Sequence, residues 1–407
     1  MWLLVWQRLS GGAPLEAAVL ELLRGLPDGF WPHPCKRLRD WRERGGVPLS
    51  SHTGAYNQAR QRLPLSVVEQ SCDRIFDQLV GRMGSGSHPA AGAFFIDGTS
   101  MRMAHSPAQI QRFPLGANQH GPAHWPVVRV LAAHDVHTGL ALRPEWGPMN
   151  GPSAVSEQRL MEILLARLPA GSIIVADRNF GVFSVAWAAA QKGHPALLRL
   201  TTARAQRLAG GPLADGIDRA IIWRPSREDR RSHPELPGDA CVKGRLIVHR
   251  VQPENGVPFL LALFTTLEGS VEELLDLYGQ RWNMETDLRT LKRELRLEQL
   301  ASASPEMAAK EIAMAMGAYN LVRAVIWAAS ERSGTPPRSY GFTRVRRIVE
   351  TFAPMVAAAA DEREAERLFG QMMHYVRQAR LPRRKRRRPP YPREVWGKGA
   401  KYPNRKC

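Results

Sequence analysis

Apolar residues recur at intervals of three to four positions in two segments near the start of the chain, residues 15–23 and 67–79. This spacing places them along one face of a helix, so it predicts that residues 1–80 are largely helical.

The pattern changes after a Gly- and Ser-containing stretch, residues 81–92, which we interpret as a linker. Two short apolar runs follow, residues 93–96 and 173–176. Each is typical of a buried strand, and each is expected to end at an aspartate, Asp97 or Asp177. Similar patterns predict further strands at residues 127–133, 140–142 and 196–200, and helices at residues 156–168 and 182–191. Together these elements predict a mixed α/β core.

A β-rich stretch with Pro- and Gly-containing loops, residues 201–266, is interpreted as an insertion within a core that covers residues 93–300. From residue 271 a helical pattern runs on to about residue 300 as one helix. Residues 301–376 are predicted to form a helical C-terminal region, with a break near residues 334–337.

The charge of the chain indicates a polyanionic partner. Its 407 residues include 57 Lys plus Arg against 38 Asp plus Glu, a net charge of +19. Basic proteins bind nucleic acids because each neutralised phosphate releases condensed counterions. Residues 377–407 contain 13 of the basic residues and one acidic residue. They are predicted to form a DNA-binding tail, with Arg384, Lys385 and Arg386 in its densest run; a solvated basic tail is the alternative.

The first 80 residues contain a second basic segment. Ser51 or Thr53 is placed to cap a short helix that ends at Pro64. That helix is expected to present Arg60 and Arg62 outward. It would serve as a DNA-contacting head, or it is an ordinary solvated helix face.

Several other classes of protein are poorly supported. The Ala-rich residues 307–329 contain Lys310, Glu311 and Arg323, so a buried or amphipathic helix is expected and no membrane partner. The four cysteines include no Cys-x-x-Cys pair, which argues against a zinc site or a disulfide framework and favours the cytoplasm. Histidines near residue 134 lack the spacing of a helical zinc site, and no Gly-x-Ser-x-Gly motif occurs.

The two strand-end aspartates suggest metal-dependent chemistry on phosphodiesters. Such chemistry needs carboxylates that converge from different elements, because hard cations take several oxygen ligands. A carboxylate at the end of a strand is also common as a cap or turn residue. Asp97 and Asp177 by themselves therefore leave both interpretations open.

The predicted helix from residue 271 adds a third carboxylate. At about 100° per residue, four polar residues fall within roughly 60° of one another on one flank: Tyr278, Arg281, Glu285 and Lys292. A metal-binding glutamate among cationic phosphate contacts would need this arrangement. An ordinary charged helix flank is the alternative.

These motifs resemble a known family. The pattern Tyr278-x2-Arg281-x3-Glu285-x6-Lys292 is similar to the Tyr-Arg-Glu-Lys signature of the insertion sequence 4 family of bacterial DDE transposases. Asp97-Gly98-Thr99 and Asp177-Arg178-Asn179-Phe180 resemble the segments around that family's two catalytic aspartates, in the same order.

The resemblance implies an RNase H-like catalytic core in which Asp97, Asp177 and Glu285 bind two Mg²⁺ or Mn²⁺ ions. It also implies phosphate contacts by Tyr278, Arg281 and Lys292, with Arg178 as a helper. The implied partners are DNA, namely terminal inverted repeats and target DNA, and a second copy of the chain in a synaptic homodimer. In some relatives an aromatic residue of the β insertion stacks on a flipped base. Trp223 is the candidate, and a packed core Trp is the alternative.

Two alternatives stay open at this point. The chain could be a catalytically decayed, transposase-derived protein that binds DNA and acts as a repressor. It could also be a structure-specific nuclease on the same core, which would cut DNA without joining it.

The basic tail provides a first test. Removing residues 377–407 should weaken DNA binding at moderate salt, because fewer phosphates are neutralised. It should also flatten the dependence of the binding constant on salt, which a titration at several salt concentrations would measure. A slope equal to that of the full chain would indicate a solvated tail with no role in binding.

Overall fold

The computed structural model describes residues 2–25, 40, 43–45, 50–83, 91–118, 121–253 and 257–381. Its centre is an eight-stranded sheet. In spatial order the strands are β5 (Glu145–Pro148), β4 (Val127–Asp135), β1 (Ala93–Arg102), β6 (Ile173–Ala176), β7 (Ala196–Arg199), β10 (Phe259–Thr265), β9 (Val242–Val251) and β8 (Ile217–Trp223).

The sheet is mixed. Strands β5, β4 and β1 are antiparallel neighbours, whereas β1, β6 and β7 run parallel. Strands β10, β9 and β8 then extend the same sheet in antiparallel fashion. The mixed α/β prediction is confirmed, and the arrangement is consistent with an RNase H-like core. The β-rich residues after β7 therefore share the hydrogen-bonded ladder of the core.

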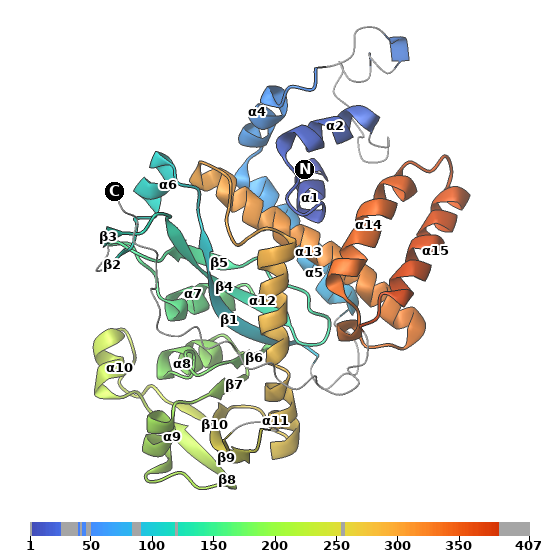
Figure 1. Ribbon diagram of the computed structural model, residues 1–407. Helices are drawn as coiled ribbons and strands as arrows, with labels where there is room; N and C mark the ends of the chain where they lie inside the picture. The colour runs from blue at the N-terminus through green and yellow to red at the C-terminus, as the bar shows by residue number, and fades with distance from the viewer. Residues whose placement is uncertain are drawn as a thin grey trace.

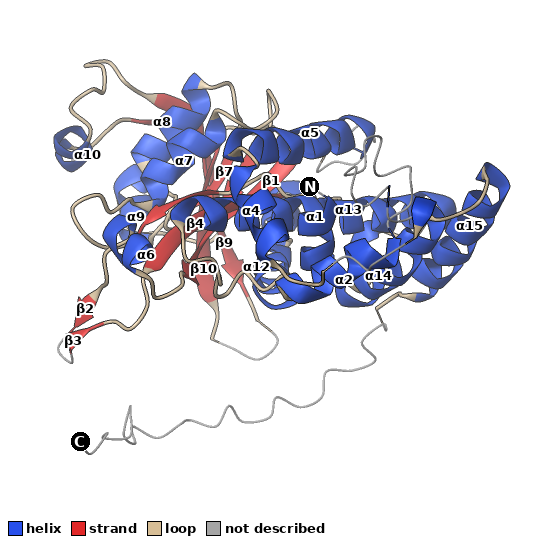
Figure 2. Ribbon diagram, turned by 90° about the horizontal axis from the view of Figure 1, so that it is seen from above, coloured by secondary structure: helices blue, strands red, loops and turns tan. Residues whose placement is uncertain are grey.

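Helices cover both faces of the sheet (Figures 1 and 2). Helices α7 (Glu157–Leu165) and α8 (Phe183–Gln191) pack on one face, where Leu160 and Phe183 join a cluster with Phe94 and Ile96 of β1. Helices α11 (Val271–Gly279) and α12 (Trp282–Glu294) pack on the other, where their apolar residues meet Phe95. Smaller elements lie at the rim of the core: α6 (Pro107–Arg112), β2 (Ala117–Asn118), β3 (Gly121–Pro122), α9 (Thr202–Ala209) and α10 (Arg227–Ser232).

A helical region lies beside the sheet and is centred on α13 (Pro305–Ser333) (Figure 2). By length and composition α13 could cross a membrane, but 72% of its most apolar window is buried inside the protein. This confirms the expectation of a buried helix. Around it lie α1 (Trp2–Leu9), α2 (Leu15–Gly25), α4 (Gly54–Arg62), α5 (Leu65–Met83), the 3₁₀ helix η2 (Pro337–Ser339), α14 (Phe342–Ala357) and α15 (Glu362–Gln378).

Two strand predictions were wrong. Asp97 does not end its strand, since β1 continues to Arg102 and Asp97 pairs with Ala132 of β4. The antiparallel partner β4 keeps β1 extended beyond the apolar run. Residues 140–142 form no strand, because only Ala141 makes a bridge, to His134. The strand that pairs with β4 on this side is β5, which begins at Glu145.

The prediction of one helix from residue 271 to about 300 was also wrong. The helix ends at Gly279, and a new one begins at Trp282. Between them the amide of Arg281 donates to the carbonyl of Tyr278 at 3.0 Å, which is a tighter turn than in an α-helix. Glycine has low helix propensity, which favours a break here.

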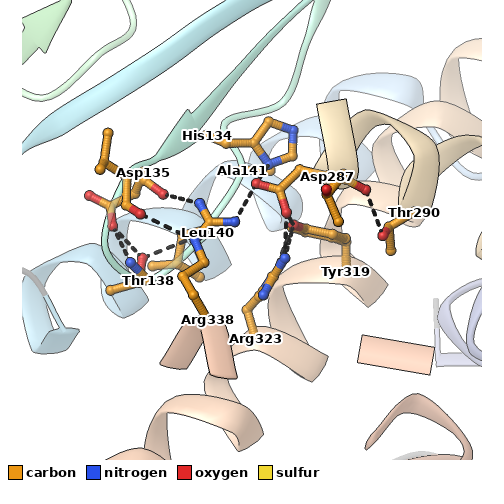
Figure 3. Close-up of polar contacts among 12 residues, drawn as sticks. His134, Asp135, Thr138, Leu140, Ala141, Asp287, Thr290, Tyr319, Arg323 and Arg338 are labelled. Atoms are coloured by element: carbon orange, nitrogen blue, oxygen red, sulfur yellow. Dashed lines mark hydrogen bonds and ion pairs between the residues drawn. The ribbon is translucent and has the colours of Figure 1, made fainter. Parts of the chain in front are cut away.

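A buried ionic network fixes α12 against the helical region (Figure 3). Asp287 of α12 accepts hydrogen bonds from Arg323 and Tyr319 of α13, at 2.5 and 3.1 Å. It also accepts one from Arg338 of η2 at 2.5 Å. His134 of β4 completes the surroundings, with Nδ1 3.7 Å from Asp287 Oδ2. One carboxylate thus joins four elements.

The same arginines hold the turn that follows β4. Arg338 donates to the carbonyls of Asp135 and Val136, at 2.8 and 3.1 Å. Gly139 closes this turn with φ +76°, and a Cβ there would lie 2.8 Å from Cζ of Arg323. Glycine is therefore required both by the backbone conformation and by the space that the guanidinium occupies.

Charge compensation keeps Asp287 ionised. Burial alone would raise the pKa of Asp287, but Arg338 and Arg323 outweigh burial and hold the pKa below its usual value. Burial lowers the pKa of His134 to about 4, so its imidazole is neutral at pH 7. The network therefore places two guanidinium groups, a buried one of Arg323 and a partly buried one of Arg338, against one buried carboxylate.

We expect Asp287→Ala to lower the free energy of unfolding by about 3–5 kcal/mol, because it leaves two guanidinium groups without their shared carboxylate. Denaturant unfolding would measure the loss. Asp276→Ala, which removes an exposed aspartate of α11, is the matched control and should change stability by less than about 0.5 kcal/mol. Equal stability of the two variants would contradict a structural role for the network.

Candidate active site

Two aspartates occupy neighbouring positions on parallel strands. The ladder between β1 and β6 ends at the pair Ile96 and Ala176; Asp97 is the next residue of β1, and Asp177 is the first residue after β6. Adjacent strands lie about 4.8 Å apart, so the two carboxyl groups are close neighbours. Each is also held locally: Asp97 Oδ1 accepts the amide of Gly98, and Asp177 Oδ1 accepts the amide of Asn179, both at 2.8 Å.

The environment of Asp97 disfavours its charged form. Burial, followed by repulsion from Asp177, raises the pKa of Asp97 to about 6. The amide of Gly98 and the guanidinium of Arg281 oppose this increase without cancelling it. A carboxyl group with a raised pKa beside a second carboxylate is typical of a functional site.

Arg281 connects Asp97 to Glu285. Its Nη1 lies 3.9 Å from Asp97 Oδ2, and its Nη2 lies 3.8 Å from Glu285 Oε1. Arg281 stands in the turn between α11 and α12, and Glu285 follows in the first turn of α12. The break in the helix thus places a guanidinium between the strand that carries Asp97 and the helix that carries Glu285.

Tyr278 lies near Arg281, Arg199 and Asp177. Tyr278 is buried, and its ring packs among the apolar residues between α11 and the sheet. Burial raises the pKa of the Tyr278 phenol, while Arg281 and Arg199 lower it. Sequence reasoning missed Arg199, although the last residue of a parallel strand next to an Asp-bearing strand is a signal that could have identified it.

Lys292 lies apart from this group. Seven residues after Glu285, it lines a cleft of about 430 Å³ together with Arg102, Arg293 and Arg296. Burial and then Arg102 lower the pKa of Lys292, whereas Glu298 raises it. The structure therefore brings Tyr278 and Arg281 to the aspartates and places Lys292 in a separate cationic cleft further along α12.

The other residues expected to contact DNA differ in exposure. Arg178 and Arg62 are exposed. Arg60 is 8% exposed and lies 3.6 Å from Glu311 of α13, so the expectation that it points outward was wrong. Its guanidinium faces the protein interior, where the carboxylate of Glu311 compensates its charge.

Two further expectations concern the tail and Trp223. Arg384, Lys385 and Arg386 lie outside the described residues. Trp223, the candidate for base stacking, is 4% exposed and packs edge-on against Phe264 and Phe183. This geometry favours the packed-core alternative for Trp223.

The carboxylate groups of Asp97 and Asp177 are chemically suited to bind a divalent cation. Carboxylate oxygens are the ligands that Mg²⁺ prefers, and a cation would relieve the repulsion between Asp97 and Asp177. Among the described residues, no three Asp, Glu, His or Cys side chains are gathered closely enough to enclose a metal ion. Arg281 lies between Glu285 and Asp97, so the link between the Glu285 carboxylate and the aspartates is the guanidinium group of Arg281.

In metal-free buffer we expect Asp97 to titrate near pH 6. Asp177→Asn removes a negative neighbour and should lower the pKa of Asp97, whereas Arg281→Ala removes a positive one and should raise it. NMR of protein labelled with ¹³C at the aspartate carboxyl carbons would measure both shifts. Asp218→Asn, remote on β8, is the control; an Asp177→Asn variant that behaves like it would contradict the proximity of the pair.

Comparison with known proteins identifies the family of the chain. Residues 88–321, more than half of the chain, match the family model described as the transposase DDE domain. The chain is also 26% identical, over 356 residues, to the transposase InsG for insertion sequence element IS4 of Escherichia coli (strain K12). That alignment covers 85% of this chain and 77% of the relative. The resemblance inferred from the motifs is thereby confirmed, and the chain belongs to the transposase DDE domain family.

Proposed function

We propose that this chain is an active DNA transposase that cuts and joins the ends of an insertion sequence through Asp97, Asp177 and Glu285. The proposal is supported by the proximity of Asp97 and Asp177 at the end of a parallel ladder, where repulsion from Asp177 raises the pKa of Asp97. Arg281 lies between Asp97 and Glu285 and so links the third carboxylate to this pair. Two carboxylates on adjacent strands are held by a rigid sheet, which is what precise positioning of a reaction centre requires.

Asp97, Asp177 and Glu285 would hold Mg²⁺ or Mn²⁺, with two ions as the expected number. When bound, such ions polarise the phosphodiester and lower the pKa of an attacking water or 3′-hydroxyl. The raised pKa of Asp97 means that it loses a proton to become a ligand. Metal binding, and cleavage at subsaturating metal, should therefore weaken as the pH falls, because protons compete with the ion for Asp97.

The cationic side chains would bind the phosphates of the DNA. Arg281 lies next to Asp97, and Arg199 lies at the neighbouring strand end, so both can reach a phosphate at the aspartates. Lys292 would bind the backbone further along the duplex, from its separate cleft. Arg178 and Arg62 are exposed and available for additional contacts.

Family membership implies that DNA is the partner. We further propose that the DNA comprises the terminal inverted repeats and a target site, and that two copies of the chain act in a synaptic homodimer in the bacterial cytoplasm. Residues 1–80 would contact DNA, residues 93–300 would carry the chemistry, and residues 377–407 would add backbone binding.

The decisive experiment measures cleavage of DNA that carries the terminal repeats of the element, with Mg²⁺ or Mn²⁺. Glu285→Gln and Asp177→Ala should each reduce cutting by at least about 100-fold, because each removes a charged metal ligand. DNA binding, measured by gel shift, should be retained. Glu285→Gln should also leave stability within about 0.5 kcal/mol, since its side chain is 39% exposed.

Other results would select the alternatives. Binding without cutting by the unmodified chain would favour a decayed transposase that acts as a repressor. Cutting without strand joining, and without dependence on paired terminal repeats, would favour a structure-specific nuclease. Unchanged cutting by both variants would exclude the proposed carboxylates.

A further inference from the structure

Glu157 lies where the two aspartate-bearing segments separate. The parallel ladder of β1 and β6 ends at Ile96 and Ala176. Beyond that pair β1 continues beside β4, while the chain after β6 turns away into a loop. The sheet positions the backbone of Asp97 and Asp177, but the spacing of their side chains also depends on contacts beyond the hydrogen bonds of the ladder.

Glu157 makes one such contact with each segment. It is the first residue of α7, and its Oε2 accepts a hydrogen bond from the side-chain amide of Asn179. The backbone amide of Asn179 in turn donates to Asp177 Oδ1 at 2.8 Å. The next residue of α7, Gln158, donates to the carbonyl of Asn179 at 3.0 Å. Two residues at the start of α7 thus hold the loop that follows β6 and carries Asp177, each through a hydrogen bond with Asn179.

The other contact is with Gly98, the residue after Asp97. A Cβ built on Gly98 would lie 2.1 Å from Oε1 and 2.3 Å from Cδ of Glu157. Gly98 is not among the glycines with positive φ, so its backbone conformation does not require glycine. The carboxylate of Glu157 occupies the space of the missing side chain, which explains why glycine follows Asp97.

We propose that Glu157 is a positioning residue: its carboxylate packs on Gly98 and holds Asn179, and so sets the spacing of Asp97 and Asp177 for metal binding. This inference rests on the proposed function. The start of a helix suits the negative charge of Glu157, because the helix dipole and free amides stabilise an anion there. Glu157 acts through Asn179 and the Gly98 backbone, and its negative charge adds to the repulsion that raises the pKa of Asp97.

The test measures Mn²⁺ affinity of the full chain without DNA, by titration calorimetry or by electron paramagnetic resonance of free Mn²⁺. Glu157→Ala should weaken binding by about tenfold, the usual effect of losing a partner that orients a ligand. Glu157→Gln should stay within about twofold, since its amide oxygen still accepts from Asn179. Glu162→Ala, on the same helix, is the matched control and should leave affinity unchanged.

A double-mutant cycle tests the contact with Gly98. Gly98→Ala should weaken Mn²⁺ binding as Glu157→Ala does, because the new methyl displaces the carboxylate. The combined variant should be no weaker than Glu157→Ala alone, since the clash is then absent. Thermal unfolding of every variant would show whether the fold is retained.

Several outcomes would overturn the inference. Additive losses in the double variant would show that Gly98 and Glu157 act independently. A loss in Glu157→Gln as large as in Glu157→Ala would show that the negative charge of Glu157, and not its contacts with Asn179 and Gly98, supports metal binding. Unchanged affinity in Glu157→Ala, together with weaker binding in Asp97→Ala and Asp177→Ala, would reject the role of Glu157 alone. Unchanged affinity in the two aspartate variants would reject the proposed metal site itself.

Discussion

The ion pairs of Asp287 join α12, which carries Glu285, to the helical region around α13. A buried carboxylate is costly unless it is paired and hydrogen-bonded, and Asp287 receives bonds from Arg323, Tyr319 and Arg338. These partners come from α13 and η2, while Asp287 belongs to α12 (Figure 3). Glu285 is two residues away on the same helix. The position of Glu285 over the sheet therefore depends on the network that holds Asp287.

The carboxylates at the sheet, Asp97 and Asp177, are less well compensated than Asp287. Around Asp287 the charges are compensated, and its pKa falls below the usual range. Asp97 and Asp177 face each other with less compensation, and the pKa of Asp97 rises to about 6. The first arrangement stabilises the protein as it stands, whereas the second leaves negative charge that a divalent cation can neutralise. The environment of Asp287 is therefore that of a structural carboxylate, whereas the environment of Asp97 and Asp177 is that of a candidate metal site.

The sequence predicted much of the fold because hydrophobic periodicity is a local property. Helix α7 and strand β6 appear where the pattern placed them, and the charged residues within the Ala-rich stretch correctly indicated a buried or amphipathic helix for α13. Errors occurred where a partner distant in sequence decided the outcome. Pairing with β4 extended β1 beyond Asp97, and pairing with Glu311 turned Arg60 inward.

What the sequence determined by itself is the chemical inventory: two aspartates after apolar runs, a Tyr-Arg-Glu-Lys series and a strongly basic tail. These are properties of residue type and spacing, and they were sufficient to indicate the family. Only the tertiary structure decided which groups meet. The turn at Arg281 placed a guanidinium between Glu285 and Asp97, and strand order placed Arg199 near Tyr278. Spacing along the chain cannot encode such contacts, because they arise where the sheet brings together elements that are far apart in sequence.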